Sequence, residues 1–279
     1  MQKILVIRSF GSIGDMLMMT PALKEVAKKG TLDLMIPINF KDLFLNLDFI
    51  DSLMGSDSMV DKSQYDKVFD LTDYEFNYEQ IHQPLINKTK IEIFKDALNI
   101  SGGEENIQIN LSDEEGMWAN LFIKKHKLRK GKIILLAIKS ANITRDWELE
   151  KWKLLIDRLK KLNFDLVIID KEMNWEDEEV TFFNNHSIRE LFSLVSISDM
   201  VLCHDSGILH IGGAFEKKTL GIFGPTDPKM RCVYKNSYWV DNGMDIPFSW
   251  YDRRDSKDYF DAISVGDVER EFLEVINNE

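Results

Sequence analysis

Apolar runs alternate with amphipathic stretches along the chain, and this pattern predicts strands that are followed by helices. The first run, "KILVIR" at 3–8, has the length and the β-branched content of a buried parallel strand. A glycine-bearing loop follows it. Thr20 and Pro21 fit the N-cap and the first position of a helix over 21–29, separate from a short turn over 14–19. The alternative is one helix that is kinked at Pro21.

The rest of the first 110 residues continues this alternation. Apolar runs predict three more short strands, at 32–37, 52–54 and 67–71, and a stretch over 89–100 carries an apolar face at helical spacing. Strands that alternate with helices are typical of a parallel, doubly wound α/β sheet. We therefore expect one such domain over residues 1 to about 110.

A polar stretch over 101–116 interrupts the pattern, and a helical segment up to about Lys127 follows it. The alternation then restarts, with strands at 132–138, 164–170, 199–203 and 219–223 and helices over 149–162, 188–197, 208–215 and 265–276. The pattern predicts an α/β fold with two Rossmann-like domains, assigned to 1–128 and 129–279, and a hinge near the polar stretch. Open α/β sheets bind ligands at the carboxyl ends of their strands, so we expect a ligand in a cleft between the two domains.

The charge and the composition narrow the function classes. A formal net charge of −12 in 279 residues argues against sequence-independent binding to nucleic acid or to an anionic membrane, since both need clustered basic residues. No stretch approaches 18 consecutive apolar residues, and the first run is too short for a signal peptide. Cys203 and Cys232 lack C-x-x-C spacing and are expected to be reduced and packed. We expect a globular protein of the cytoplasm with at most a peripheral membrane contact.

Sequence patterns for metal binding are missing from the chain. Its five histidines show no H-E-x-x-H or other zinc spacing, and no two aspartates are separated by a single residue. The D-x-D signature of many metal-dependent sugar transferases is therefore absent. We expect no metal ligands.

The first candidate loop follows the first strand. Its glycines, Gly11-x-x-Gly14, match neither the dinucleotide fingerprint G-x-G-x-x-G nor the P-loop, and Asp15 comes directly after them. Asp15 is either a catalytic carboxylate or a cap of the turn that follows, because aspartate is a preferred N-cap residue. Its position after the first strand adds weight to the catalytic hypothesis.

The second candidate loop, "HDSG", follows the strand at 199–203. It places Asp205, Ser206 and Gly207 at the start of a helix whose free amides can hold a phosphate. Asp205 either caps this helix or faces a ribose, a sugar or a backbone group of a bound nucleotide. His210, one turn further along, is either a phosphate contact or a satisfied core histidine.

Two further stretches follow strands of the second domain. "KSANITRDW" offers four polar side chains toward the expected cleft, those of Lys139, Ser140, Thr144 and Arg145. A cation there can neutralise a leaving diphosphate, and the ordinary alternative is a solvated surface arginine. "FGPTDPK" has the residues of a tight turn, and its Thr226 can line a pocket.

At this point two long segments resemble a known family. "KILVIRSFGSIGDMLMMTPALKEV" and "LFSLVSISDMVLCHDSGILHIGGAFEKKTLGIFGPTDP" are similar to the two ends of glycosyltransferase family 9, the ADP-heptose:lipopolysaccharide heptosyltransferases and their relatives. The resemblance implies a GT-B architecture of two Rossmann-like domains, with the nucleotide-sugar held mainly by the C-terminal one. It also implies inverting, metal-independent transfer in lipopolysaccharide biosynthesis.

The resemblance assigns roles to residues of this chain. Asp15 matches the glycine-aspartate motif of the family and would be the general base that deprotonates the acceptor hydroxyl. The donor is expected to be a nucleotide-sugar such as ADP-heptose, with no other cofactor, and the acceptor a glycan or glycolipid. Residues expected to bind the nucleotide-sugar are Gly14, Lys139, Ser140, Arg145, Asp205, Ser206, Gly207, His210 and Thr226.

Two other functions stay open at this stage. Members of the family usually carry a proline-glycine-alanine stretch, then a basic residue and tryptophan, where this chain has "IKSANITRDW". A catalytically inactive nucleotide-sugar-binding protein with a regulatory or assembly role is therefore an alternative. A GT-B-like epimerase or phosphorylase, which attacks the anomeric carbon with water or phosphate, is another.

Overall fold

The fold was analysed in a computed structural model of the chain, which describes residues 1–82, 86–170, 176–243 and 259–278. The chain divides into two compact units, Met1–Ser112 and Asp113–Glu279. Each unit is built around its own parallel sheet. The units are described one after the other.

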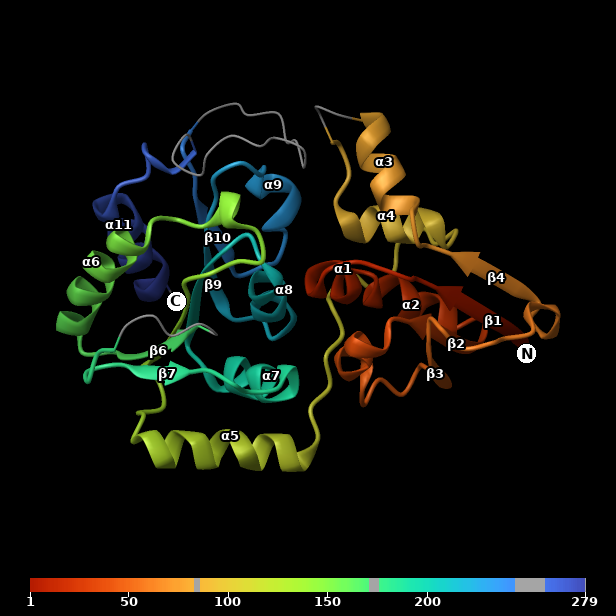
Figure 1. Cartoon of the computed structure of the whole chain (residues 1–279), viewed down its shortest axis with the longest axis horizontal. Helices are drawn as coiled ribbons and strands as arrows, with labels where there is room; N and C mark the ends of the chain where they lie inside the picture. Colours follow the sequence, from red (N-terminus) through yellow and green to blue (C-terminus); the bar gives the residue numbers. More distant parts are fainter. Residues whose placement is uncertain (83–85, 171–175, 244–258, 279) are drawn as a thin grey trace. The chain divides into compact units, whose positions relative to one another are not determined.

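The sheet of the first unit has four strands in the order β3-β2-β1-β4 (Figure 1). The strands are β1 (Gln2–Ile7), β2 (Gly30–Ile36), β3 (Ser52–Gly55) and β4 (Lys67–Asp70), and all neighbouring pairs are parallel. The central strand β1 lies between two neighbours, so that Val6 has Leu34 on one side and Phe69 on the other. Its apolar run is buried, as expected of an interior parallel strand.

Four α-helices and two short 3₁₀-helices complete the described part of the first unit. They are α1 (Ile13–Met18), α2 (Thr20–Ala27), η1 (Ile38–Phe44), η2 (Lys62–Gln64), α3 (Tyr74–His82) and α4 (Lys90–Ala97). The chain forms two helices around Pro21 rather than one kinked helix. The predicted N-cap is wrong, since Met19 occupies that position and the Thr20 hydroxyl instead donates to the Leu17 carbonyl at 2.7 Å. Helix α3 was not predicted.

The sheet of the second unit has six parallel strands in the order β10-β9-β8-β5-β6-β7. These are β5 (Ile133–Ala137), β6 (Asp165–Ile169), β7 (Thr181–Phe183), β8 (Met200–His204), β9 (Lys218–Ile222) and β10 (Ser237–Val240). Both central strands, β5 and β8, are buried along their whole length. The short edge strands β7 and β10 were not predicted.

Helices cover both faces of this second sheet. They are α5 (Asp113–His126), α6 (Leu149–Leu159), α7 (Ile188–Ile197), α8 (Gly207–Ala214), α9 (Pro228–Arg231) and α11 (Val265–Asn277), with 3₁₀-helices η3 (Ile143–Arg145) and η4 (Lys160–Leu162). Figure 1 shows α6 and α11 on one face and α7 and α8 on the other. Trp152 and Leu155 of α6 pack with Phe272 of α11 in the core on that first face. The predicted apolar face of α6 is therefore buried.

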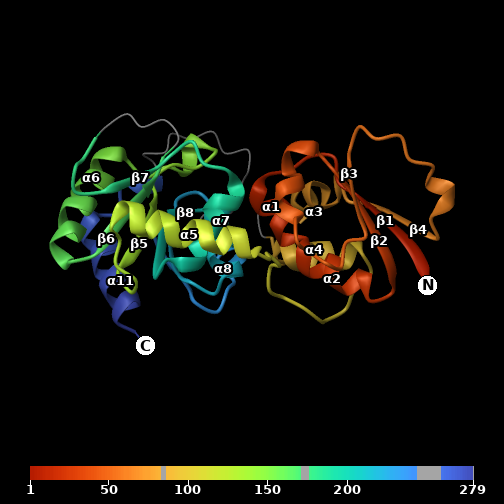
Figure 2. The same ribbon diagram turned by 90° about the horizontal axis from the view of Figure 1, so that it is seen from below.

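The division of the chain falls before α5 rather than after it. The predicted boundary after residue 128 lies beyond α5, but α5 packs against α7 and so belongs to the second unit (Figure 2). The polar stretch at 101–116, where the hinge was expected, includes this division.

Both sheets reverse their chain order next to the first strand of the unit. The first sheet runs β3-β2-β1-β4, and the second runs β7-β6-β5-β8-β9-β10, which is the strand order of a Rossmann fold. The reversal lies between β1 and β4 in the first unit and between β5 and β8 in the second. Loops that follow these four strands are where α/β sheets bind ligands.

Candidate functional site

Asp15 lies in the first turn of α1, directly after β1. Ser12 is the N-cap of α1, and its hydroxyl accepts from the Asp15 amide at 3.3 Å, while Asp15 Oδ2 accepts from the Ser12 amide at 2.8 Å. Gly14 is buried in the same turn. Gly11 has φ +151°, and a Cβ there would lie 3.1 Å from Arg8 Nη2, so a glycine is needed at this position. Asp15 thus closes a capping box from the third position of α1, and the N-cap is Ser12 rather than Asp15, which the capping hypothesis expected.

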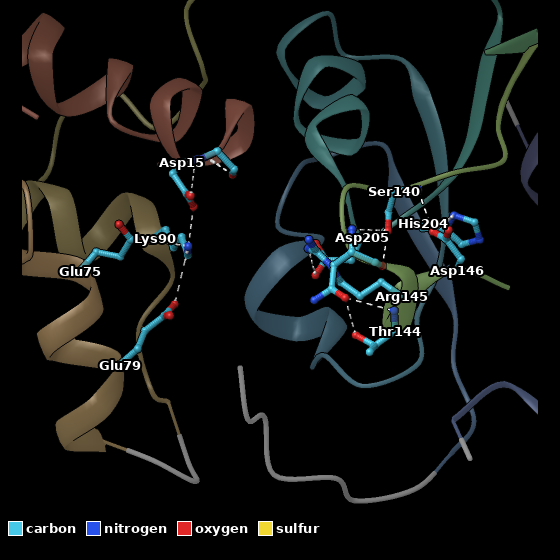
Figure 3. A network of polar contacts seen from close by, with 12 residues as sticks. Asp15, Glu75, Glu79, Lys90, Ser140, Thr144, Arg145, Asp146, His204 and Asp205 are labelled. Atoms are coloured by element: carbon cyan, nitrogen blue, oxygen red, sulfur yellow. Dashed lines mark hydrogen bonds and ion pairs between the residues drawn. The ribbon is translucent and has the colours of Figure 1, made fainter. Parts of the chain in front are cut away.

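Asp15 also belongs to a buried cluster of charged side chains (Figure 3). Its Oδ1 accepts from the ammonium of Lys90, at the start of α4, and the same ammonium donates to Glu75 of α3. The Lys90 nitrogen lies 3.9 Å from a carboxylate oxygen of Glu79, one turn further along α3. Arg8 pairs with the other carboxylate oxygen of Glu75 and donates to the Leu71 carbonyl at 3.1 Å.

The cluster holds Asp15 in its ionised form. Burial alone would raise the pKa of this carboxyl group, but the charge and hydrogen bond of Lys90 outweigh it, with smaller contributions from the Ser12 amide and Arg8. The pKa of Asp15 therefore lies well below its usual range. At neutral pH this position carries a fixed negative charge with lone pairs that can accept a proton.

The sequence analysis missed the partners of Asp15. Two signals pointed to them: Arg8 ends the apolar first strand, and Glu75 and Glu79 are spaced i, i+4 and so share one helix face. Lys90 follows the capping residue Thr89 and gave no signal of its own.

In the second unit, Asp205 follows β8 and pairs with Arg145, which follows β5. Arg145 Nη1 donates to Asp205 Oδ2 at 3.3 Å, and both side chains are largely buried. Burial alone would raise the pKa of Asp205, but the guanidinium groups of Arg145 and Arg231 lower it. Arg145 is therefore not a solvated surface residue. Neither does Asp205 cap α8, whose N-cap is Ser206.

The start of α8 carries no side-chain cap. Ser206 has extended backbone, and its hydroxyl makes no capping hydrogen bond to the amides that follow Gly207. Among the described residues, the buried Ser206 hydroxyl has no hydrogen-bond partner. The buried Thr226 hydroxyl, after β9, contributes to lowering the pKa of Asp205. Buried polar atoms that lack a partner are uncommon unless a ligand or water pairs with them. The Ser206 hydroxyl and the amides of a helix start are thus available to one ligand.

The loop over 139–147 is fixed to the end of β8 by His204. His204 is fully buried, and its Nε2 accepts from the Trp147 amide at 2.8 Å and from Trp152 Nε1 at 3.2 Å. Burial, with the nearby Arg145 charge, lowers the pKa of His204 to about 3. The ring is therefore neutral, with its proton on Nδ1 because Nε2 is an acceptor.

The remaining predicted residues of the second unit lie in or beside this loop and in α8. The Ser140 amide donates to Asp146 Oδ1 at 2.7 Å, and Lys139 is exposed. The Thr144 hydroxyl donates to Asn142 within the loop at 2.9 Å. His210 is buried, with Nδ1 2.7 Å from the Tyr234 hydroxyl, so this nitrogen is satisfied inside the protein.

The structure therefore gathers the predicted residues into one group in each unit. Asp15 and Gly14 lie at the switch point of the first sheet. Ser140, Arg145, Asp205, Ser206 and Thr226 follow β5, β8 and β9, which are neighbours in the second sheet and end at one edge. Among the described residues, no three His, Cys, Asp or Glu side chains are arranged to hold a metal ion. No helix in the described ranges is long and apolar enough to cross a membrane.

A parallel α/β sheet in each unit, with polar residues at its switch point, defines a Rossmann-like α/β protein. The family model of glycosyltransferase family 9 (heptosyltransferase) matches residues 60–242, which is more than half of the chain. The chain therefore belongs to this family and is a glycosyltransferase. The comparison with curated proteins gave no match.

Solved structures confirm the fold over almost the whole chain. A family 9 glycosyl transferase from Veillonella parvula has a TM-score of 0.78 at 15% identity, covering 99% of this chain and 97% of the other. The ADP-heptose lps heptosyltransferase II of E. coli has a TM-score of 0.72 at 13% identity, covering 98% of both chains. For E. coli heptosyltransferase WaaC with ADP-2-deoxy-2-fluoro heptose, the TM-score is 0.63 at 14% identity, covering 97% and 99%. The predicted GT-B class of α/β fold is thus confirmed.

Proposed function

We propose that this protein transfers a sugar from a nucleotide-sugar to a hydroxyl group of a glycan or glycolipid, with inversion at the anomeric carbon and without a metal ion. The observation that carries the proposal is the ionised carboxylate of Asp15, fixed at the switch point of the first sheet. Such a group can take up the proton of an acceptor hydroxyl.

In the proposed reaction, Asp15 removes the proton from the acceptor hydroxyl while that oxygen forms a bond to the anomeric carbon. The bond between this carbon and the diphosphate oxygen breaks at the same time. The charge of the leaving diphosphate is stabilised by the amides at the start of α8, by the Ser206 hydroxyl and by the positive charges of Arg145 and Arg231. This set of donors supports a mechanism without a metal.

We propose ADP-heptose as the donor and an intermediate of lipopolysaccharide synthesis as the acceptor. The family supports a heptosyl donor, and one protein of the same fold is described with ADP-2-deoxy-2-fluoro heptose. We also propose that the enzyme acts in the cytoplasm, with at most peripheral membrane contact.

Asp15→Asn tests the proposal. The amide still accepts from the Ser12 amide but cannot take up a proton, so we expect transfer from ADP-heptose to fall by about 10²–10⁴-fold. Binding of ADP, measured by calorimetry, should be unchanged, because all the predicted nucleotide-sugar-binding residues except Gly14 lie in the second unit. Asp33→Asn is the matched control: Asp33 is equally buried in the first unit, but it accepts from the Tyr65 hydroxyl. Full turnover of Asp15→Asn would contradict the role of Asp15.

One observation favours a second candidate, a nucleotide-sugar-binding protein without transfer activity. Lys90 lowers the pKa of Asp15, and a carboxylate with a low pKa is a weak proton acceptor. This candidate predicts that the wild-type protein binds ADP-heptose but releases no ADP from it with any member of a panel of glycan acceptors. Release of ADP that depends on an acceptor would exclude it.

A further inference from the structure

The cluster of five charged residues that includes Asp15 poses a chemical problem, because the residue that must accept a proton is paired with a buried ammonium. We propose that Arg8, Asp15, Glu75, Glu79 and Lys90 form one proton-accepting unit, in which Lys90 positions the Asp15 carboxylate and the two glutamates keep Lys90 paired once Asp15 is neutral. The inference rests on the proposed role of Asp15 as the base. It adds a positioning residue and a charge-balancing pair that the sequence motifs do not contain.

The geometry of Lys90 supports this assignment. An ammonium group has three N–H donors, and three carboxylates surround this one: it donates to Asp15 and Glu75 and lies 3.9 Å from Glu79. The Lys90 side chain is 2% exposed. When Asp15 takes up a proton and its attraction for Lys90 weakens, the ammonium keeps its two glutamate partners, so a buried unpaired charge is avoided.

The formal charges of the unit offset part of the cost that Lys90 imposes on proton uptake by Asp15. Arg8 and Lys90 contribute two positive charges, and Asp15, Glu75 and Glu79 contribute three negative charges, so the described unit carries one net negative charge. A proton on Asp15 brings that sum to zero. Uncompensated charge is costly in a buried site, so the transferred proton removes an unfavourable charge.

Helix α3 is oriented to supply these charges. A surface helix ordinarily turns its apolar residues inward, but α3 buries Glu75 and Glu79 and leaves Ile81 77% exposed. Arg8 is held in place by Phe94 of α4, because its guanidinium lies 4.8 Å from the ring centroid of Phe94. Burial of two glutamates costs free energy that a merely structural helix would avoid.

The other elements packed against α1 add little charge to the unit. Helix α2 carries Lys24 and Glu25, which pair with Glu104 and Lys28 instead, and η1 carries Lys41 and Asp42. The groups that act on the Asp15 carboxylate are Lys90, Arg8 and the Ser12 amide.

The test compares pH profiles of turnover with ADP-heptose. Lys90→Met leaves Arg8 as the cation of the described unit beside three carboxylates, so Asp15 should hold a proton more readily. An acid limb should then appear above about pH 5 in the turnover profile, where the wild type shows none. Turnover at neutral pH should fall about 100-fold, because a displaced reacting group costs about that much. Lys90→Arg should restore part of this loss.

Glu79→Gln removes a negative charge from the unit, whereas Lys90→Met removes a positive one. The unit is then neutral before transfer and positive after it, so proton uptake becomes less favourable. We expect turnover to fall at every pH without the acid limb of Lys90→Met. Lys95→Met is the matched control, because Lys95 is a buried lysine of the same helix whose amine lies 3.9 Å from Glu105 instead. Its profile should match that of the wild type.

A measurement without substrate separates this inference from the proposed function. The carboxyl ¹³C signal of Asp15, assigned by its loss in Asp15→Asn, should titrate at higher pH in Lys90→Met than in the wild type. If that signal and the pH profile are the same in both proteins, the unit does not exist as proposed, even where Asp15→Asn is inactive. If Asp15→Asn keeps full turnover while the signal moves, Lys90 still sets the ionisation of Asp15, but the proton-accepting role is overturned with the proposed function.

Discussion

Buried polar side chains in this protein serve two purposes at once. Asp15 closes a capping box in α1 and also pairs with Lys90. His204 ends the buried strand β8 and also fixes the loop that carries Arg145. In each case one side chain links a local element to a distant one. Substitutions at these positions are therefore expected to affect both stability and the candidate site.

His204 makes the second unit sensitive to acid. Its pKa is about 3 in the folded protein and 6.5 as an ordinary value, so below pH 6.5 the unfolded chain binds a proton that the folded chain does not. The contribution of His204 to the free energy of unfolding should be fully present above about pH 6.5. It should fall by about 1.4 kcal/mol per pH unit from about pH 6 toward pH 4. His204→Gln keeps an acceptor for the Trp147 amide and should remove this contribution to the slope.

Urea unfolding followed by tryptophan fluorescence at several pH values measures this slope. All six tryptophans follow residue 112, so the signal reports on the second unit. His82→Gln, in the first unit, is the control and should leave the slope unchanged. An identical slope in wild type and His204→Gln would show that His204 does not titrate on unfolding.

At the scale of elements, α3 shows how tertiary structure can override a local pattern. The helix buries Glu75 and Glu79, while Tyr74 and Ile81 are exposed. Hydrophobic periodicity assumes that apolar residues face the core, so it could not place this helix. In contrast, β1, β5 and β8 were predicted from their apolar runs, because interior parallel strands are buried on both faces.

Because α3 buries charged residues and exposes apolar ones, substitutions on its charged face should destabilise the first unit more than substitutions on its apolar face. Glu75→Gln removes one partner of two buried cations, Arg8 and Lys90, and should lower the free energy of unfolding of the first unit by about 3 kcal/mol. Ile81→Ser replaces an exposed apolar residue and should change the free energy of unfolding of the first unit by less than about 0.5 kcal/mol. Far-UV circular dichroism during urea unfolding measures both. A larger loss for Ile81→Ser than for Glu75→Gln would show that the apolar face is the packed one.

At the scale of the whole molecule, the two units have different predicted tasks, the proton acceptor in the first and the nucleotide in the second. ADP at about 100 times its dissociation constant should stabilise the second unit by about 2.7 kcal/mol. The shift should appear in the tryptophan fluorescence transition and should be the same with EDTA, as expected if the phosphates bind amides, hydroxyls and arginines. A shift that EDTA abolishes would contradict the metal-free proposal.

The sequence by itself determined the α/β alternation and the loops after β1 and β8, with Asp15 directly after the glycines of the first loop. These features depend on hydrophobic periodicity and capping, which act over a few neighbouring residues. Only the tertiary structure decided that Asp15 pairs with Lys90, 75 residues away, and that His204 accepts from the Trp147 amide, 57 residues away. The order of strands in a sheet brings such partners together, and the residues near each partner in the sequence do not encode that order.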